Sequence, residues 1–121
     1  ISPAEPVSVA NGDVRIPVTS LADRKLHRYV ARADGADVRF IAILDASGAV
    51  HAGLDACQIC GIQGYYQDGA NVICRHCSAA IYIPSIGMAG GCNPIHIDYR
   101  VDAETLIIPE GALAAGAQYF R

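Results

Sequence analysis

The sequence contains no apolar run long enough to cross a membrane as a helix. The apolar stretch 79–91 is interrupted by Pro84, Ser85 and glycines, whereas a membrane-spanning helix needs about eighteen or more consecutive apolar residues. Lysine and arginine are also scarce. Their nine side chains are dispersed along a chain of formal net charge −3, so they form no basic face that would neutralise a row of phosphates. We therefore expect a soluble chain without a nucleic-acid partner.

Recognisable catalytic patterns are missing as well. No glycine-rich phosphate loop follows a predicted strand, no paired carboxylates stand in a recognisable setting, and no Ser-His-Asp order is present. The sequence also lacks a long amphipathic helix and any internal repeat beyond two cysteine pairs. Ordinary catalysis is therefore unsupported, and we expect an electron-transfer or metal-binding protein rather than an enzyme.

Length and composition predict one domain. With 121 residues, of which 52% are hydrophobic, the chain can form a compact core without help from a metal. Residues 1–13 are mostly polar and end in a turn signal, so we expect a flexible N-terminal segment and a single metal-binding β domain over residues 14–121. The chain begins with Ile1 rather than Met. We expect it to be part of a longer protein with a membrane anchor or a removed signal peptide.

Short runs of apolar residues separated by turn signals predict an antiparallel meander. The expected class is all-β, a small antiparallel sandwich or barrel, and residues 110–117 are expected to add one or two helical turns at the C-terminus. The expected strands cover residues 14–18, 26–30, 38–44, 49–52, 65–66, 71–73, 80–83, 95–101 and 106–108.

Two cysteine pairs carry the strongest chemical signal. Cys57-x-x-Cys60 and Cys74-x-x-Cys77 are separated by residues 61–73, whose predicted hairpin brings the two pairs together. Two intervening residues let the backbone curl so that both thiolates of a pair face one metal. Five cysteines are an odd number, which favours a metal site, with disulfides in an oxidising compartment as the alternative. Sulfur ligation suits zinc and iron alike, as a single ion or an iron–sulfur cluster.

Residues 40–108 resemble the Rieske pattern. They read as a strand, a turn, two metal loops that open at Cys57 and Cys74, an apolar strand, a glycine-containing loop and a closing strand. In the Rieske pattern each loop supplies one Cys and one His. Here Cys77 stands in place of the histidine of the second loop, and Cys60 lies one residue beyond the histidine position of the first loop. All-cysteine ligation is expected to lower the reduction potential toward about −400 mV, as in plant-type ferredoxins, and to remove histidine-dependent proton coupling.

A set of motifs in fixed order covers nearly the whole domain. It consists of Asp55-Ala-Cys57-x-x-Cys60-Gly61, Gly64-Tyr65, Ile73-Cys74-x-x-Cys77, Gly90-Gly91-Cys92-Asn93-Pro94 and Tyr119-Phe120. In this set the chain is similar to the FtrD-like membrane iron–sulfur proteins. The resemblance implies an extracytoplasmic (periplasmic) domain, membrane-anchored in the full-length protein, that works with a membrane iron permease or a redox partner protein. It also implies an iron–sulfur cluster or mononuclear iron, used for electron transfer or metal handling in iron acquisition.

The fifth cysteine, Cys92, lies in the glycine-rich loop 84–94, which on the Rieske comparison folds over the metal. It is a candidate fifth ligand, a replacement ligand after oxidation, a member of a copper site with Met88 and a histidine, or a buried thiol that only packs. We expect its sulfur within a few ångströms of the centre, where it does not complete the ligand set. His96 shares the predicted solvent face with Asp98 and is expected to be a surface residue.

Other side chains near the cysteines are expected to play supporting roles. His76 lies between two cysteines and is expected to be exposed. His51 is a candidate for contact with the metal ligands rather than with the metal itself. The aromatic rings of Tyr65, Tyr66 and Tyr82 are expected to separate the centre from water.

Three functions follow from these patterns. The first is an extracytoplasmic iron or iron–sulfur domain that passes electrons or metal ions to a partner in iron acquisition. The second is a structural zinc module whose surface binds another protein. The third is a copper or iron carrier that adds Cys92 and one or more of Met88, His51 and His96 to the site. The predicted metal ligands are Cys57, Cys60, Cys74 and Cys77, with Cys92 as the additional candidate.

Overall fold

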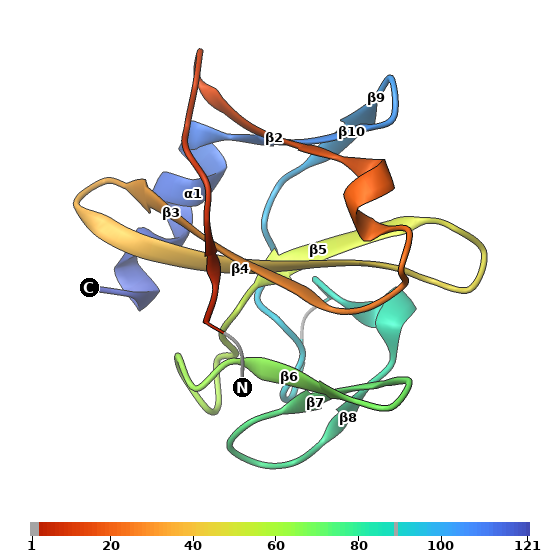
Figure 1. Cartoon of the computed structure of the whole chain (residues 1–121). Helices are drawn as coiled ribbons and strands as arrows, with labels where there is room; N and C mark the ends of the chain where they lie inside the picture. Colours follow the sequence, from red (N-terminus) through yellow and green to blue (C-terminus); the bar gives the residue numbers. More distant parts are fainter. Residues whose placement is uncertain (1–2, 89) are drawn as a thin grey trace.

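The computed structural model describes residues 3–88 and 90–121, in which three small β-sheets are arranged one above another (Figure 1). The middle sheet has four strands in the order β1-β3-β4-β5, and only the β1–β3 pairing is parallel. The β3–β4 hairpin turns through Asp34 and Gly35, which have positive φ angles of 48° and 75°, as tight two-residue turns of this kind require. The strands of this sheet are β1 (Glu5–Pro6), β3 (His27–Ala33), β4 (Ala36–Leu44) and β5 (Val50–Leu54).

Two antiparallel sheets of three strands lie on either side of the middle sheet (Figure 1). The first contains β2 (Asp13–Pro17), β10 (Thr105–Pro109) and β9 (Arg100–Asp102), and the second contains β6 (Tyr65–Asp68), β7 (Asn71–Cys74) and β8 (Ala80–Ile81). The helical elements are η1 (Val18–Leu21), η2 (Ile83–Ser85), α1 (Glu110–Gly116) and η3 (Ala117–Tyr119). A small, mostly β fold with one short C-terminal helix confirms the predicted class.

Strand β4 separates two hydrophobic cores because both of its faces are buried. Successive side chains of a strand point to opposite faces. Phe40 and Ala42 therefore join the larger core, which also contains residues of β2, β10 and α1, whereas Ile41 and Ile43 join a smaller core that contains cysteines. All four side chains are fully buried. This arrangement explains why the strand has a continuous apolar run rather than an alternating pattern.

Residues 5–9 contact the domain, although the sequence predicted a flexible region over residues 1–13. Strand β1 pairs with β3, the backbone N–H of Val7 donates to the carbonyl of Val30 at 2.9 Å, and Val7 and Val9 pack against the larger core. These residues therefore pack against the domain that the sequence predicted to begin at Val14, and that division of the chain stays a prediction. A two-residue strand that ends in a proline is too short to give a recognisable pattern, and its pairing comes from the exposed edge of β3. Residues 1 and 2 of the predicted segment lie outside the described residues.

The predicted strand over residues 95–101 is wrong for most of its length, because β9 covers only Arg100–Asp102. The residues before β9 follow the end of β5 instead of forming a ladder. The N–H of Leu54 donates to the carbonyl of Ile95 at 2.8 Å, and the N–H of Ile95 donates to the carbonyl of Ala56 at 3.0 Å. This contact fixes the loop that carries Cys92 beside the loop that begins after β5.

Candidate metal centre

The five cysteines lie on three loops that meet at the smaller core. Cys57 and Cys60 follow β5, Cys74 is the last residue of β7, Cys77 lies in the β7–β8 turn, and Cys92 lies between η2 and β9. The side chains of the first three and of Cys92 pack with Ile41 and Ile43 of β4 in the smaller core. The hairpin β6–β7 therefore brings the two cysteine pairs together, as the sequence predicted.

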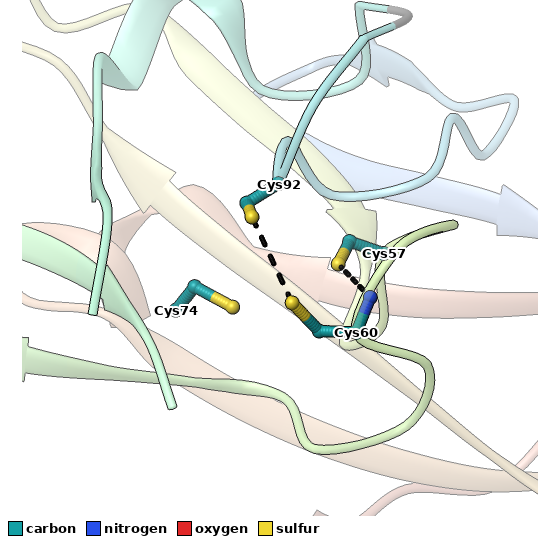
Figure 2. A group of neighbouring side chains, drawn as sticks. All are labelled: Cys57, Cys60, Cys74 and Cys92. Atoms are coloured by element: carbon teal, nitrogen blue, oxygen red, sulfur yellow. Dashed lines mark hydrogen bonds between the residues drawn. The ribbon is translucent and has the colours of Figure 1, made fainter. Parts of the chain in front are cut away.

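Four of the five sulfurs form one compact group. The Sγ atoms of Cys57, Cys60, Cys74 and Cys92 all lie within 4.8 Å of one another, and Figure 2 shows these side chains converging from three segments of the chain. Cys57 and Cys74 are buried, and Cys60 and Cys92 are half-buried. Within residues 3–88 and 90–121, this is the one group of His, Cys, Asp and Glu side chains whose ligand atoms could hold a metal ion.

Cys92 completes this group of four, and the Cys77 sulfur lies beside it. The Cys92 sulfur is 3.7 Å from that of Cys60, which confirms the expectation that it lies within a few ångströms of the centre. Cys77 is exposed, lies outside the group of four, and contacts the Cys92 sulfur directly. A tight turn, in which the N–H of Ser78 donates to the carbonyl of Cys74 at 2.9 Å, places Cys77 at the surface of the protein. The five-cysteine ligand set itself stays a prediction.

The loop with the first cysteine pair is closed by its own backbone. Cys57 and Gly61 exchange two backbone hydrogen bonds, of 3.1 and 2.9 Å, and Gly61 has a positive φ of 66°, which glycine adopts without strain. This turn directs the N–H of Cys60 at the Cys57 sulfur, 3.0 Å away. A sulfur that accepts a backbone N–H is stabilised in its charged form, the form that binds metals.

The thiols of the group differ in their readiness to ionise. Burial tends to raise the pKa of Cys57, but hydrogen bonds from the Cys60 N–H and neighbouring groups outweigh burial, and the net shift is downward. Burial and the neighbouring thiols raise the pKa of Cys60. The contact between the Cys77 and Cys92 sulfurs lowers the pKa of Cys77 to about 7 and raises that of Cys92 to about 11. Because metals bind thiolates, metal binding here releases protons and weakens as the pH falls.

Tyr65 is fully buried and connects the loops that carry the cysteines. Its hydroxyl donates to the backbone carbonyl of Cys92, and the register of the β6–β7 hairpin places it opposite Cys74. Burial raises the pKa of Tyr65, and negative charge on Cys57 and Cys74 raises it further, so the hydroxyl stays protonated and remains a donor. The prediction that aromatic rings shield the centre fits Tyr65, whereas Tyr82 is 74% exposed.

Two of the candidate histidines, His51 and His96, pair with carboxylates, and His76 is exposed, as predicted. His51 Nε2 is 2.8 Å from a carboxylate oxygen of Asp45, and His96 Nε2 is 2.7 Å from one of Asp98. His96 is exposed, as its predicted solvent face requires, and Met88 is 63% exposed. The sulfur group therefore contains no histidine, which removes the geometric basis for the copper-type site with His51 or His96.

His96→Ala is expected to leave the metal content of the protein unchanged, because its imidazole pairs with an exposed carboxylate rather than with the sulfur group. Elemental analysis of the purified variant, beside the wild-type protein prepared in parallel, measures this directly. A substantial loss of metal would bring His96 into the site and revive the copper-type hypothesis.

The family described as membrane iron–sulfur containing protein FtrD-like matches residues 21–120, which include all five cysteines. The chain belongs to this family. No curated protein and no solved structure matches the chain significantly. The FtrD-like family and the sulfur group together support metal binding, and they do not identify the metal. The Rieske-like outline stays a prediction.

The FtrD-like family is membrane-associated by its description. Among the residues that the structure describes, no helix is both long and apolar enough to span a membrane.

A buried ion-pair network behind the first cysteine pair was not singled out by the sequence analysis. Asp55 is fully buried, and its carboxylate accepts hydrogen bonds from the guanidinium groups of Arg28 and Arg39. The available signal was the place of Asp55 in the motif that ends at Cys57. Nothing in the sequence marks the two arginines, which occupy ordinary polar positions in predicted strands.

Proposed function

We propose that the domain binds iron, as a mononuclear ion or an iron–sulfur cluster, and passes electrons or metal ions to a partner in iron acquisition. The ligands in this proposal are Cys57, Cys60, Cys74 and Cys92, with Cys77 beside them as an exposed fifth thiol. The observation that carries the proposal is the group of four sulfurs within 4.8 Å of one another in a chain of the FtrD-like family.

The spacing of the sulfurs supports binding of a metal. A tetrahedral ion about 2.3 Å from each of four sulfurs keeps those sulfurs about 3.8 Å apart, so the observed group can close on one ion with small shifts. A cluster contains more than one iron, and the sulfurs would have to move apart to bind it. Thiolates are soft ligands that suit iron and zinc, and no hard oxygen ligand stands among them.

The ligand type and the exposure of the cysteines determine which transfer reactions such a centre could support. Bound iron would supply a one-electron change of charge, and if it were held as a cluster, all-cysteine ligation would give an expected potential toward about −400 mV. The half-buried Cys60 and Cys92 and the exposed Cys77 leave one side of the group open to a partner, whereas Cys57 and Cys74 lie against the apolar core. Transfer through this open side to a membrane iron permease or a redox partner protein, outside the cytoplasm, is part of the proposal.

Protein purified without air is expected to absorb visible light between about 320 and 600 nm and to bleach on reduction, because sulfur-to-iron charge transfer colours such sites. Elemental analysis for iron and zinc, with an assay for inorganic sulfide, completes the experiment on the same sample. Iron with sulfide indicates a cluster, and iron without sulfide indicates a mononuclear centre. A colourless protein that contains one zinc would overturn the electron-transfer proposal.

A structural zinc module is the second candidate, and the all-sulfur group favours it as much as it favours iron. In that case the metal closes three loops and a surface of the domain binds another protein. The larger core contains no cysteine, so we expect it to form without the metal. Removing zinc with a chelator is expected to loosen the three loops and to leave the four-stranded sheet folded.

A further inference from the structure

Asp55 lies two residues before Cys57 and is the one charged side chain that is fully buried among the described residues. Its Oδ2 atom accepts hydrogen bonds from Arg28 Nε at 3.1 Å, Arg28 Nη2 at 2.9 Å and Arg39 Nε at 3.1 Å. Its Oδ1 atom accepts the backbone N–H of Tyr65 at 2.9 Å. One carboxylate therefore joins the start of the cysteine loop, the end of that loop and two strands of the middle sheet.

Arg39 extends the network along the loop. Its Nη2 atom donates to the carbonyl of Asp55 at 3.3 Å and to the carbonyl of Ile62, and its guanidinium lies 5.3 Å from the ring centroid of Phe120. The side chain comes from the same face of β4 as Ile41, the face that packs against the cysteines. Arg39 thus holds backbone on both sides of Cys57 and Cys60.

Gly64 shows how closely the carboxylate fits the loop. A Cβ atom at this position would lie 2.8 Å from Asp55 Oδ1, and the backbone has a positive φ of 84°. Glycine is therefore required both for the conformation and for the approach of the carboxylate. The carbonyl of Gly64 also accepts the N–H of Arg75 at 2.9 Å, which connects the first cysteine loop to the turn of the second.

A merely stabilising role explains this network poorly. Buried ion pairs often contribute no more to stability than apolar side chains of the same size would, because both charges lose their hydration. The fold already has two apolar cores, and outside the ion pairs themselves the side chains of Asp55 and Arg39 bond to backbone at the two ends of the cysteine loop, at Asp55, Ile62 and Tyr65. Such a network fixes the geometry of the loop.

We propose that Asp55 is a positioning residue of the metal centre, which with Arg28 and Arg39 clamps both ends of the loop that carries Cys57 and Cys60. The clamp holds the first two sulfurs in place before a metal binds. Its effect on metal affinity rests on the proposed function, whereas its effect on the loop does not.

Asp55→Asn tests the clamp, because asparagine keeps the size of the side chain but removes the negative charge between two guanidinium groups. The matched control is Asp45→Asn. Asp45 also accepts several hydrogen bonds, from Ser47, Ala49 and His51, but it holds the β4–β5 turn, outside the cysteine loops. Comparison of the two variants therefore distinguishes the effect of losing any hydrogen-bonded carboxylate from the effect of losing the one between Arg28 and Arg39.

Two measurements are made on each protein. Competition with a chelator gives the affinity for iron(II), and mass mapping after a maleimide pulse gives the labelling rate of Cys57 in the metal-free protein. For Asp55→Asn we expect affinity to fall about 10-fold and Cys57 labelling to accelerate. This is the lower end of the range for losing an outer partner at a metal site, because Asp55 bonds to arginines and backbone rather than to a sulfur. For Asp45→Asn we expect neither change.

The inference is overturned if folded Asp55→Asn labels at the wild-type rate, or if Asp45→Asn shows the same acceleration. If Asp55→Asn does not fold, Arg39→Lys decides, because lysine keeps the charge but cannot reach Asp55 and Ile62 with a planar fork. This variant is expected to fold, to label faster at Cys57 and to bind iron more weakly, and wild-type values in both assays would refute the clamp. A wild-type protein that binds no metal would refute the proposed function alone, and the labelling rates would still judge the clamp.

Discussion

Cys74→Ser is expected to lose most of its bound metal. The Cys74 sulfur is buried in the smaller core and belongs to the group of four within 4.8 Å. A serine hydroxyl stays protonated at neutral pH and is a poor substitute for a thiolate, so three sulfurs remain and one coordination position opens. Metal content by elemental analysis, together with visible absorption if iron is bound, measures the loss.

Cys77→Ser is the matched control, because it makes the same chemical change three residues away at an exposed thiol outside the group. We expect this variant to keep its metal, and we expect Cys92→Ser to behave like Cys74→Ser. Stoichiometric metal in Cys74→Ser would remove that residue from the site. If Cys77→Ser lost its metal and Cys92→Ser kept it, the ligand set would be the two cysteine pairs, as spacing alone suggests.

Ile41→Ala is expected to lower the free energy of unfolding of the metal-free protein by about 2–5 kcal/mol, the usual range for removing a large buried aliphatic side chain. Ile41 is fully buried on the face of β4 that packs with the cysteines. The cavity lies beneath the sulfur group, so we also expect faster release of metal to a chelator. Chemical denaturation and the rate of metal release are measured on the same preparation.

Phe40→Ala separates the two effects, because Phe40 is equally buried but points to the larger core. Its loss is expected to cost about 3–5 kcal/mol of stability while the rate of metal release from the folded protein stays near the wild-type value. If both variants released metal at the same increased rate, release would follow global unfolding, and the division of the domain into two cores by β4 would have no consequence for the centre.

Local patterns made much of the fold predictable. The hairpin through Asp34 and Gly35, the hairpin between the cysteine pairs and the C-terminal helical turn each depend on neighbouring residues. The alternation over residues 95–101 was misleading. It indicates an extended segment with one buried face and one exposed face, but it does not show whether a partner strand pairs with that segment. The pairing of residues 5–6 with β3 was missed because a segment so short has no pattern of its own.

The sequence by itself determined the β class, the presence of a sulfur-rich centre and the FtrD-like family, because spacing within a loop and alternation along a strand are local properties. Only the tertiary structure decided which sulfurs lie together. Cys92 is 32 residues from Cys60 in sequence and enters the group because Ile95 pairs with the backbone after β5, whereas the β7–β8 turn leaves Cys77 at the surface. The partners of Asp55 were likewise decided by the fold, since the register of β3 and β4 brings two distant arginines to one buried carboxylate.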